Sequence, residues 1–277
     1  MRLGRVVFYS LFCLTLVLGL GIFAGPVRAQ ETFRLSPEAR FQLGMDSGYI
    51  WHWGEMLIPA GGRPDSGTKI DVASELGVNQ GEATGITFNG IIQNSHLVNF
   101  DYLLYSPSGV KRLPRTLRFH NRTYAADTTV ETRLDFNWLR FDYGYKLWDM
   151  SSWWVAPRVG MHYVRYSATL NGKPEEEEGT TSNNRSLDTI FPVIGLEARY
   201  LLPLGAELIA EVEGMHLITT GFLAMLKLEA RWELHPDVTL SIAGFNRFVQ
   251  CQEDNQPLNN EWSFGLFGGT AGVSFAF

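Results

Sequence analysis

Four side chains in the second half of the sequence are of the types that serine-type hydrolysis requires. Such a site needs a serine hydroxyl within hydrogen-bond reach of a histidine, and a carboxylate that orients the histidine. Ser167, His162, His216 and Glu213 could supply these groups, but no motif joins them. The sequence also lacks a recognisable set of paired acidic residues and an Asp–His pair for a protease. We therefore predict no catalytic residue, no enzyme activity and no cofactor. Three other histidines are expected in solvated turns or loops: His52, His96 and His120.

Charged residues recur at every second position in the later part of the chain. In "MLKLEARWEL", 225 to 234, one set of alternate positions is wholly apolar and the other is almost wholly charged. In "AELIAEVEGMH", 206 to 216, Glu207, Glu211 and Glu213 share one face. A period of two indicates β-strands, each with one apolar and one charged face.

The same period predicts ten strands, near 38–52, 82–93, 96–105, 127–147, 153–170, 188–202, 206–217, 222–234, 238–250 and 261–277. Tight joints at 93–96, 148–152, 203–206 and 235–237 alternate with long polar loops at 53–81, 106–126, 171–187 and 251–260, with one short exception at 218–221. Within 127–147 the apolar phase changes near Trp138, and either a β-bulge or two separate strands would account for the change.

The beginning of the chain predicts export. Arg2 and Arg5 precede a long apolar run, and Val27 and Ala29 suit a signal-peptidase site, so we expect a signal peptide at 1–29 and a single domain at 30–277. An uncleaved anchor helix is the alternative. Without the three arginines of that segment, 20 basic and 29 acidic residues remain, and this excess of acidic residues argues against a nucleic-acid partner. Cys251 then has no partner for an intrachain disulfide, and a thiolate metal site is excluded.

The end of the chain and its aromatic residues point to a membrane. A soluble sandwich would alternate similarly, but here aromatic residues cluster at strand ends, as at Trp51 and Trp53, which suits the two membrane interfaces. The tail "AGVSFAF" resembles the C-terminal assembly signal of bacterial outer-membrane proteins, which ends in Gly-x-x-aromatic-x-aromatic. The matching segment contains Gly272, Val273, Phe275 and Phe277. The resemblance implies recognition by the barrel assembly machinery and by periplasmic chaperones.

The architecture resembles the small outer-membrane barrels of the OmpA, OmpX and OmpW kind. We therefore expect an all-β fold, a transmembrane antiparallel up-and-down β-barrel of about ten strands, with eight or twelve possible, in the outer membrane of a Gram-negative cell. A barrel of this size is narrow enough for side chains to fill it, so charges of both signs in the lumen are expected to pair. The predicted lumen charges are Arg40, Asp46, Asp101, Arg140, Asp142, Lys146, Arg158, His162, Glu197, Arg199, Glu207, Glu211, Glu213, Lys227, Glu229, Arg231 and Glu233.

Three loop segments complete the prediction. The basic cluster Lys111, Arg112, Arg115, Arg118 and Arg122 is expected to contact lipopolysaccharide phosphates. The segment 66–78 is expected to pack on itself, and the alternatives are folding over the mouth of the barrel or binding a partner. The acidic segment 173–184 is expected to be solvated, with no metal site, and the alternative is binding of calcium or magnesium near lipopolysaccharide. We expect a monomer with a structural or surface-binding function toward lipopolysaccharide or a partner. The alternatives are a porin-like channel for small or hydrophobic solutes and a lipid-A-modifying enzyme.

Overall fold

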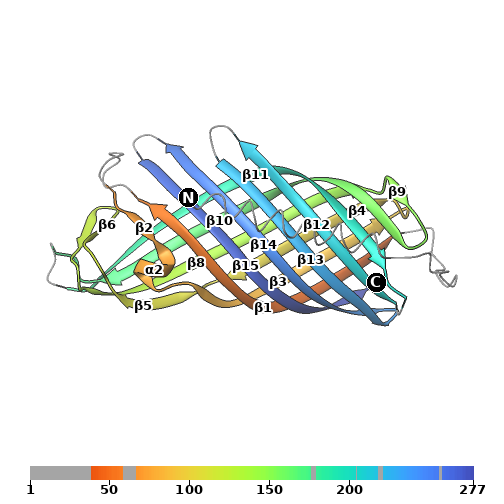
Figure 1. Cartoon of the computed structure of the whole chain (residues 1–277), viewed down its shortest axis with the longest axis horizontal. Helices are drawn as coiled ribbons and strands as arrows, with labels where there is room; N and C mark the ends of the chain where they lie inside the picture. The colour runs from red at the N-terminus through yellow and green to blue at the C-terminus, as the bar shows by residue number, and fades with distance from the viewer. Residues whose placement is uncertain (1–38, 59–66, 176–178, 204, 218–220, 256–257) are drawn as a thin grey trace. The chain divides into compact units, whose positions relative to one another are not determined.

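The computed structural model describes residues 39–58, 67–175, 179–203, 205–217, 221–255 and 258–277. The predicted signal peptide therefore lies outside the described residues. Ten long antiparallel strands form a closed barrel, which confirms the predicted fold class and strand number (Figure 1). They are β1 (Arg40–Leu57), β3 (Gln80–Ile92), β4 (His96–Tyr105), β8 (Thr129–Tyr145), β10 (Trp153–Gly172), β11 (Thr181–Leu201), β12 (Ala206–Leu217), β13 (Gly221–His235), β14 (Val238–Asn255) and β15 (Leu258–Ala276).

The barrel is closed by its first and last strands. β1 pairs with β15 from Gln42 and Ala276 to Leu57 and Glu261. Beyond this register, the Phe277 N–H donates to the Phe41 carbonyl at 3.0 Å. Lipid offers no hydrogen bonds to an unpaired strand edge, so a barrel closed in this way has no edge to leave unsatisfied. We call the end that carries Arg40 and Phe277 the periplasmic end, and the opposite end the outer end.

The outward surface of the barrel is apolar along a band that ends in aromatic residues on both sides. At the periplasmic end, the Phe41 ring lies 5.6 Å from Phe88 and 6.2 Å from Phe277. At the outer end, Trp53 stacks on Phe248 at 5.6 Å, and Trp51 lies near Phe267. Aromatic rings are favoured at the two membrane–water interfaces, so the two groups mark the limits of the lipid-facing band.

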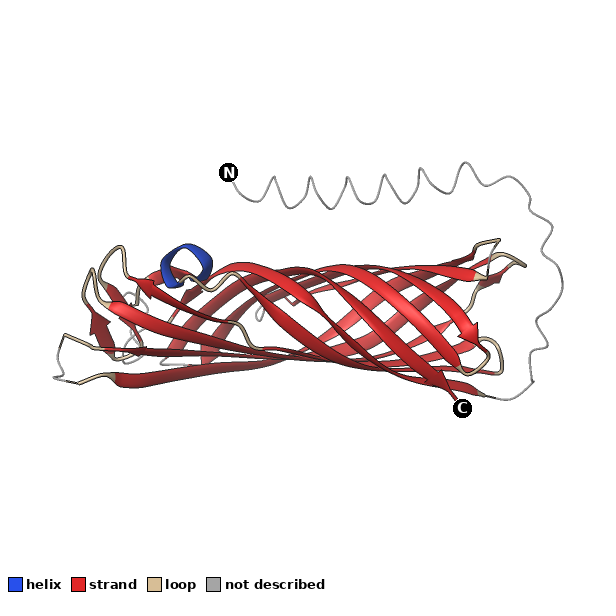
Figure 2. Ribbon diagram, turned by 90° about the horizontal axis from the view of Figure 1, so that it is seen from below, coloured by secondary structure: helices blue, strands red, loops and turns tan. Residues whose placement is uncertain are grey.

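Short elements complete the two ends of the barrel. At the outer end lie β2 (Lys69–Asp71), α2 (Val72–Leu76), β5 (Ser108–Arg112), β6 (Leu117–Phe119) and β7 (Arg122–Tyr124), while β9 (Trp148–Asp149) lies at the periplasmic end (Figure 1). Figure 2 shows the helix, α2, at the end of the barrel away from the C-terminus. The Asp71 side chain caps α2 by accepting a hydrogen bond from the Ser74 N–H at 2.8 Å, and Gly77 ends the helix with a φ of 72°. None of the helices among the described residues has the length and apolar character to cross a membrane.

Both explanations considered for the change of apolar phase near Trp138, a β-bulge and two separate strands, are wrong. β8 keeps one register with β4 and with β10 through Trp138, which pairs with Leu103 and Val164. Phe136 and Trp138 point into the lumen, whereas Phe141 is exposed on the outer surface. The apolar phase changes because the outer half of the lumen is itself apolar, so one uninterrupted strand places apolar residues inside in one half and outside in the other.

The predicted long loops at 171–187 and 251–260 are also wrong, because most of their residues belong to strands. β10 continues to Gly172 and β11 starts at Thr181, while β14 and β15 leave only residues 256–257 between them. The outward positions on the β11 extension are polar, as at Ser182, Asn184 and Ser186, all of which are exposed. A strand that has left the lipid needs no apolar outer face, so its polar composition resembles that of a loop.

Candidate functional site: the barrel lumen

Arg140 on β8 is the centre of the charged half of the lumen. Its guanidinium lies 2.8 Å from both Asp101 and Asp142, and its Nη2 lies 2.6 Å from Glu211 Oε2 and 2.5 Å from Glu213 Oε1. The Arg140 side chain is only 1% exposed. A buried cation is tolerated when its donors are satisfied, and this one is surrounded by carboxylates from three strands.

A second arginine and a histidine extend this network around the barrel. Arg158 on β10 pairs with Asp142, with Glu197 at 2.5 Å and with Glu211 at 3.3 Å. Trp138 Nε1 donates a hydrogen bond to His162 Nδ1 at 3.1 Å, so Nδ1 carries no proton. His162 Nε2 therefore carries the ring proton and donates it to Glu213 at 2.8 Å.

Further pairs continue the network toward the periplasmic end. Arg199 bridges Glu197 at 2.5 Å and Glu207 at 3.2 Å. The remaining pairs are Lys227 with Glu229 at 2.7 Å and with Glu211 at 3.8 Å, Arg231 with Glu229, Lys146 with Asp149 at 3.7 Å, and Arg40 with Glu233 at 3.9 Å. Arg40 and Glu233 are about 40% exposed, so the last of these pairs lies at the open mouth.

The charged side chains come from one wall of the barrel and face a wall of small residues. Strands β8 and β10 to β13 carry most of the charges, whereas the periplasmic half of β14, β15, β1 and β3 presents small lumenal residues: Ser241, Thr270, Gly272, Ser274, Gly44, Gly85 and Thr87. At Gly85 even a Cβ would collide with the Asp46 carboxylate. Long side chains opposite small ones fill a narrow lumen without a central channel.

The sequence prediction missed Arg247 on β14, whose side chain lies in the lumen. It is 6% exposed, and its guanidinium lies 5.0 Å from the Trp138 ring and 4.9 Å from the Phe245 ring. The neighbouring inward positions on β14 are apolar or small, so no charged face indicated it. The sequence feature that could have identified it is its place among the alternate positions of β14 that face the lumen.

The outer half of the lumen is filled by an apolar core. Its largest members include Tyr105, Phe136, Tyr166, Trp262 and Phe264, and the Tyr166 ring lies 4.2 Å from Trp262. The segment 67–78 contributes to this core through Ile70, Val72, Leu76 and Val78, all of which are buried. This segment therefore packs its apolar side chains against the outer part of the core, beside the end of β1.

The structure separates the serine from the histidines that were considered with it. His162 and Glu213 are in contact inside the lumen, but Ser167 lies on the outward face of β10 and bonds with Asn184 at 3.4 Å. His216 also points outward, toward Phe222. Ser167 and His162 are five positions apart on β10, and residues an odd number of positions apart on a strand point to opposite sides. The expected solvation of His52 is wrong, because this residue is 3% exposed and its Nδ1 lies 2.9 Å from the Tyr105 hydroxyl.

The basic cluster of 106–126 is partly engaged within the outer end. Arg115 binds Glu75 of α2 at 2.5 Å and 3.0 Å, and Lys111 donates to the Ser74 carbonyl at 2.5 Å. Burial raises the pKa of Glu75, but hydrogen bonds from Arg115 and from the Asp71 N–H lower it more, so this pKa lies below its ordinary value. Arg115 and Lys111 therefore hold α2 over the core.

The other basic residues of this cluster are exposed or partly exposed. Arg112 pairs with Asp127 at 3.2 Å, and both side chains are about 70% exposed. Arg118 is exposed, and Arg122 is partly exposed. Part of the acidic segment, residues 176–178, lies outside the described residues, and the rest of the described chain contains no cluster of three potential metal ligands.

Comparisons with known proteins agree on the fold. No protein-family model matches the sequence, and no curated protein does either. The outer membrane protease OmpT from Escherichia coli is similar in structure, with a TM-score of 0.58 and 14% identity over 90% of this chain and 100% of that chain. The translocator domain of the autotransporter NalP from Neisseria meningitidis has a TM-score of 0.42 and 13% identity over 88% of this chain and 90% of that one. The likeness to OmpT, at 14% identity, establishes the β-barrel fold and no activity.

Proposed function

We propose that this protein is a closed outer-membrane barrel with a structural or surface-binding function, and that its surface partner is lipopolysaccharide. The observation that carries the proposal is the filling of the lumen over both halves. Paired charges occupy the periplasmic half, and aromatic and aliphatic side chains occupy the outer half. A solute would have to break buried ion pairs and then cross an apolar core.

A channel for small or hydrophobic solutes is the competing function. It requires either a continuous water column or an apolar path that leads out of the barrel. The many contacts of Arg140 oppose a water column in the charged half, because each broken contact would leave a buried carboxylate without its cation. The packing of Leu76 and Val78 in the core opposes a path through the outer mouth.

The surface-binding part of the proposal depends on the cations that are not committed to α2. Arg112 and Arg118 are exposed near the outer end of the barrel, where the phosphates of lipopolysaccharide would lie. An arginine fork suits a phosphate group, although Asp127 must share Arg112 with it. We therefore assign the contacts to Arg112 and Arg118, with Arg122 beside them, and assign Arg115 and Lys111 to the support of α2.

Binding of the purified protein to lipopolysaccharide tests this assignment. Two exposed contacts worth about 0.2 to 1 kcal/mol each correspond to a loss of roughly 2- to 30-fold in affinity for Arg112→Gln/Arg118→Gln. The loss should shrink as salt screens the charges. Arg40→Gln removes an exposed cation at the periplasmic end and serves as the matched control. Equal binding by the double variant and the wild type at low salt would contradict the proposal.

A further inference from the structure

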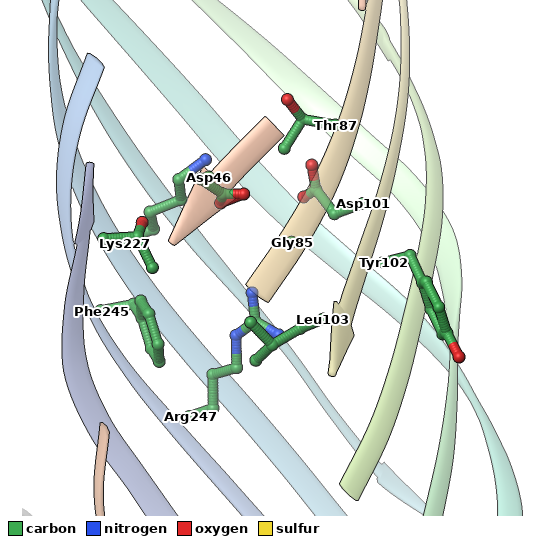
Figure 3. Close-up of a pocket in the computed structure, with 10 residues that line it drawn as sticks. Asp46, Gly85, Thr87, Asp101, Tyr102, Leu103, Lys227, Phe245 and Arg247 are labelled. Atoms are coloured by element: carbon green, nitrogen blue, oxygen red, sulfur yellow. The ribbon is translucent and has the colours of Figure 1, made fainter. Parts of the chain in front are cut away.

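A small cavity lies where the charged half of the lumen meets the apolar half. Asp46 of β1, Thr87 of β3, Lys227 of β13, Arg247 of β14 and Thr270 of β15 contribute polar side chains to its wall. Leu103 and Phe245 belong to the apolar core and also line the cavity. Figure 3 shows the Arg247 side chain rising past the level of Leu103 toward the side on which Asp46 lies.

Two oppositely charged groups at this cavity have unused hydrogen-bonding atoms. Asp46 Oδ1 is buried without a hydrogen-bond partner among the described residues, and so are Arg247 Nε and Nη1. No ion pair joins Asp46 to Arg247 in this part of the chain, although both face the same space. The guanidinium lies over the Trp138 and Phe245 rings, which offer it no acceptor oxygen or nitrogen.

Leaving such atoms unsatisfied is costly for charged groups in a buried site. The neighbouring charges are already committed, because Asp101 binds Arg140 at 2.8 Å and Lys227 binds Glu229 at 2.7 Å. The carboxylate of Asp46 needs a donor, and the guanidinium of Arg247 needs an acceptor. The missing ligand must therefore be able to donate and accept at once.

The size and the charge of the cavity decide which ligand fits. The cavity leaves about 20 Å³ for the centre of a water molecule, and one water requires roughly 10 to 15 Å³ on this measure. A phosphate or sulfate ion is too large. A small anion would be repelled by Asp46 and Asp101, and a metal cation by Lys227 and Arg247.

We propose that this cavity is a binding site for a structural water molecule that bridges Asp46 and Arg247. The water donates one hydrogen bond to Asp46 Oδ1 and accepts one from Arg247 Nε or Nη1. Thr87 and Thr270, which line the same cavity, are the candidates for its remaining hydrogen bonds. The bound water thereby completes the polar layer at the boundary with the apolar core, without an added ion.

A crystal structure of the full barrel at a resolution that shows ordered water tests the proposal. The expected result is a single density peak within hydrogen-bond distance of Asp46 Oδ1 and of one Arg247 nitrogen. Asp46→Glu lengthens this side chain by one methylene, so we expect the carboxylate to reach Arg247 directly and the peak to disappear. Direct Asp46–Arg247 contact in the wild type, an empty cavity, or the density of a bound ion would each overturn the proposal.

Unfolding in urea gives a second test that does not depend on crystals. Asp46→Asn and Arg247→Met should each lower the urea midpoint, and the double variant should lower it by less than the sum of the two shifts, because each single variant leaves the bridge without one end. Strictly additive shifts would mean that nothing connects the two groups. Arg133→Met, which removes a cation from an exposed pair on β8, is the control for the loss of one surface charge.

Discussion

Replacing Arg140 by Met should destabilise the barrel more than any surface substitution of an arginine. The side chain is 1% exposed and is within 2.8 Å of carboxylate oxygens from Asp101, Asp142, Glu211 and Glu213. Met fills much of the volume but supplies no charge, so these carboxylates stay buried beside one another. Removing one partner of a buried ion pair costs about 3 to 5 kcal/mol, and we expect a loss in that range in the free energy of unfolding.

Urea unfolding of the protein in lipid vesicles measures this loss. Arg133→Met on the same strand is the matched control, because its pair with Asp135 leaves the arginine 62% exposed and should contribute only about 0.2 to 1 kcal/mol. Adding Glu213→Gln to the Arg140→Met variant removes one of the stranded charges and should restore part of the stability. A loss below about 1 kcal/mol for Arg140→Met, equal to that of the control, would refute the view of Arg140 as the centre of the network.

Two further predictions concern the two ends of the barrel. Changing Phe275 and Phe277 to Asp should reduce the amount of assembled barrel in the outer membrane, since both rings are more than half exposed on the lipid side; normal recovery of the heat-modifiable form would contradict this. Glu75→Gln should release α2 and speed amide hydrogen exchange of residues 69–78 at neutral pH. In the wild type the pKa of Glu75 is lowered, so the contribution of its carboxylate is present above the ordinary value of 4.5 and is lost as the pH falls through the lowered pKa. Exchange in this segment that is unaffected by both changes would contradict the role given to the Glu75–Arg115 pair.

The strands could be predicted from the sequence because alternation is a local property. Apolar and mostly charged residues alternate along 225–234, and the structure has β13 over Gly221–His235. The predicted ends of the strands were less accurate. β10 and β11 continue into water, where both polar and apolar outward residues are tolerated, so the alternation is lost there. Alternation could also not reveal that the lumen is apolar in its outer half, because the faces of Phe136 and Phe141 look equally apolar in the sequence.

The partners of the lumen charges could not be predicted from alternation. Arg140 and Glu213 are brought together by the curvature of the closed barrel, since their strands are not neighbours in the sheet. The same limit applies to Arg115, whose contact with Glu75 depends on how the segment 67–78 folds over the core. Arg247 was missed because its strand has no charged face.

Single-channel recording in a planar lipid bilayer shows whether the lumen of the folded barrel is closed to ions. Heat-modifiable migration of the same preparation would first establish that the barrel is folded. We expect no stable unitary current from the wild-type protein, because paired charges fill one half of the lumen and an apolar core fills the other. Reproducible unitary currents from the folded wild-type barrel would contradict a closed lumen and would favour the channel.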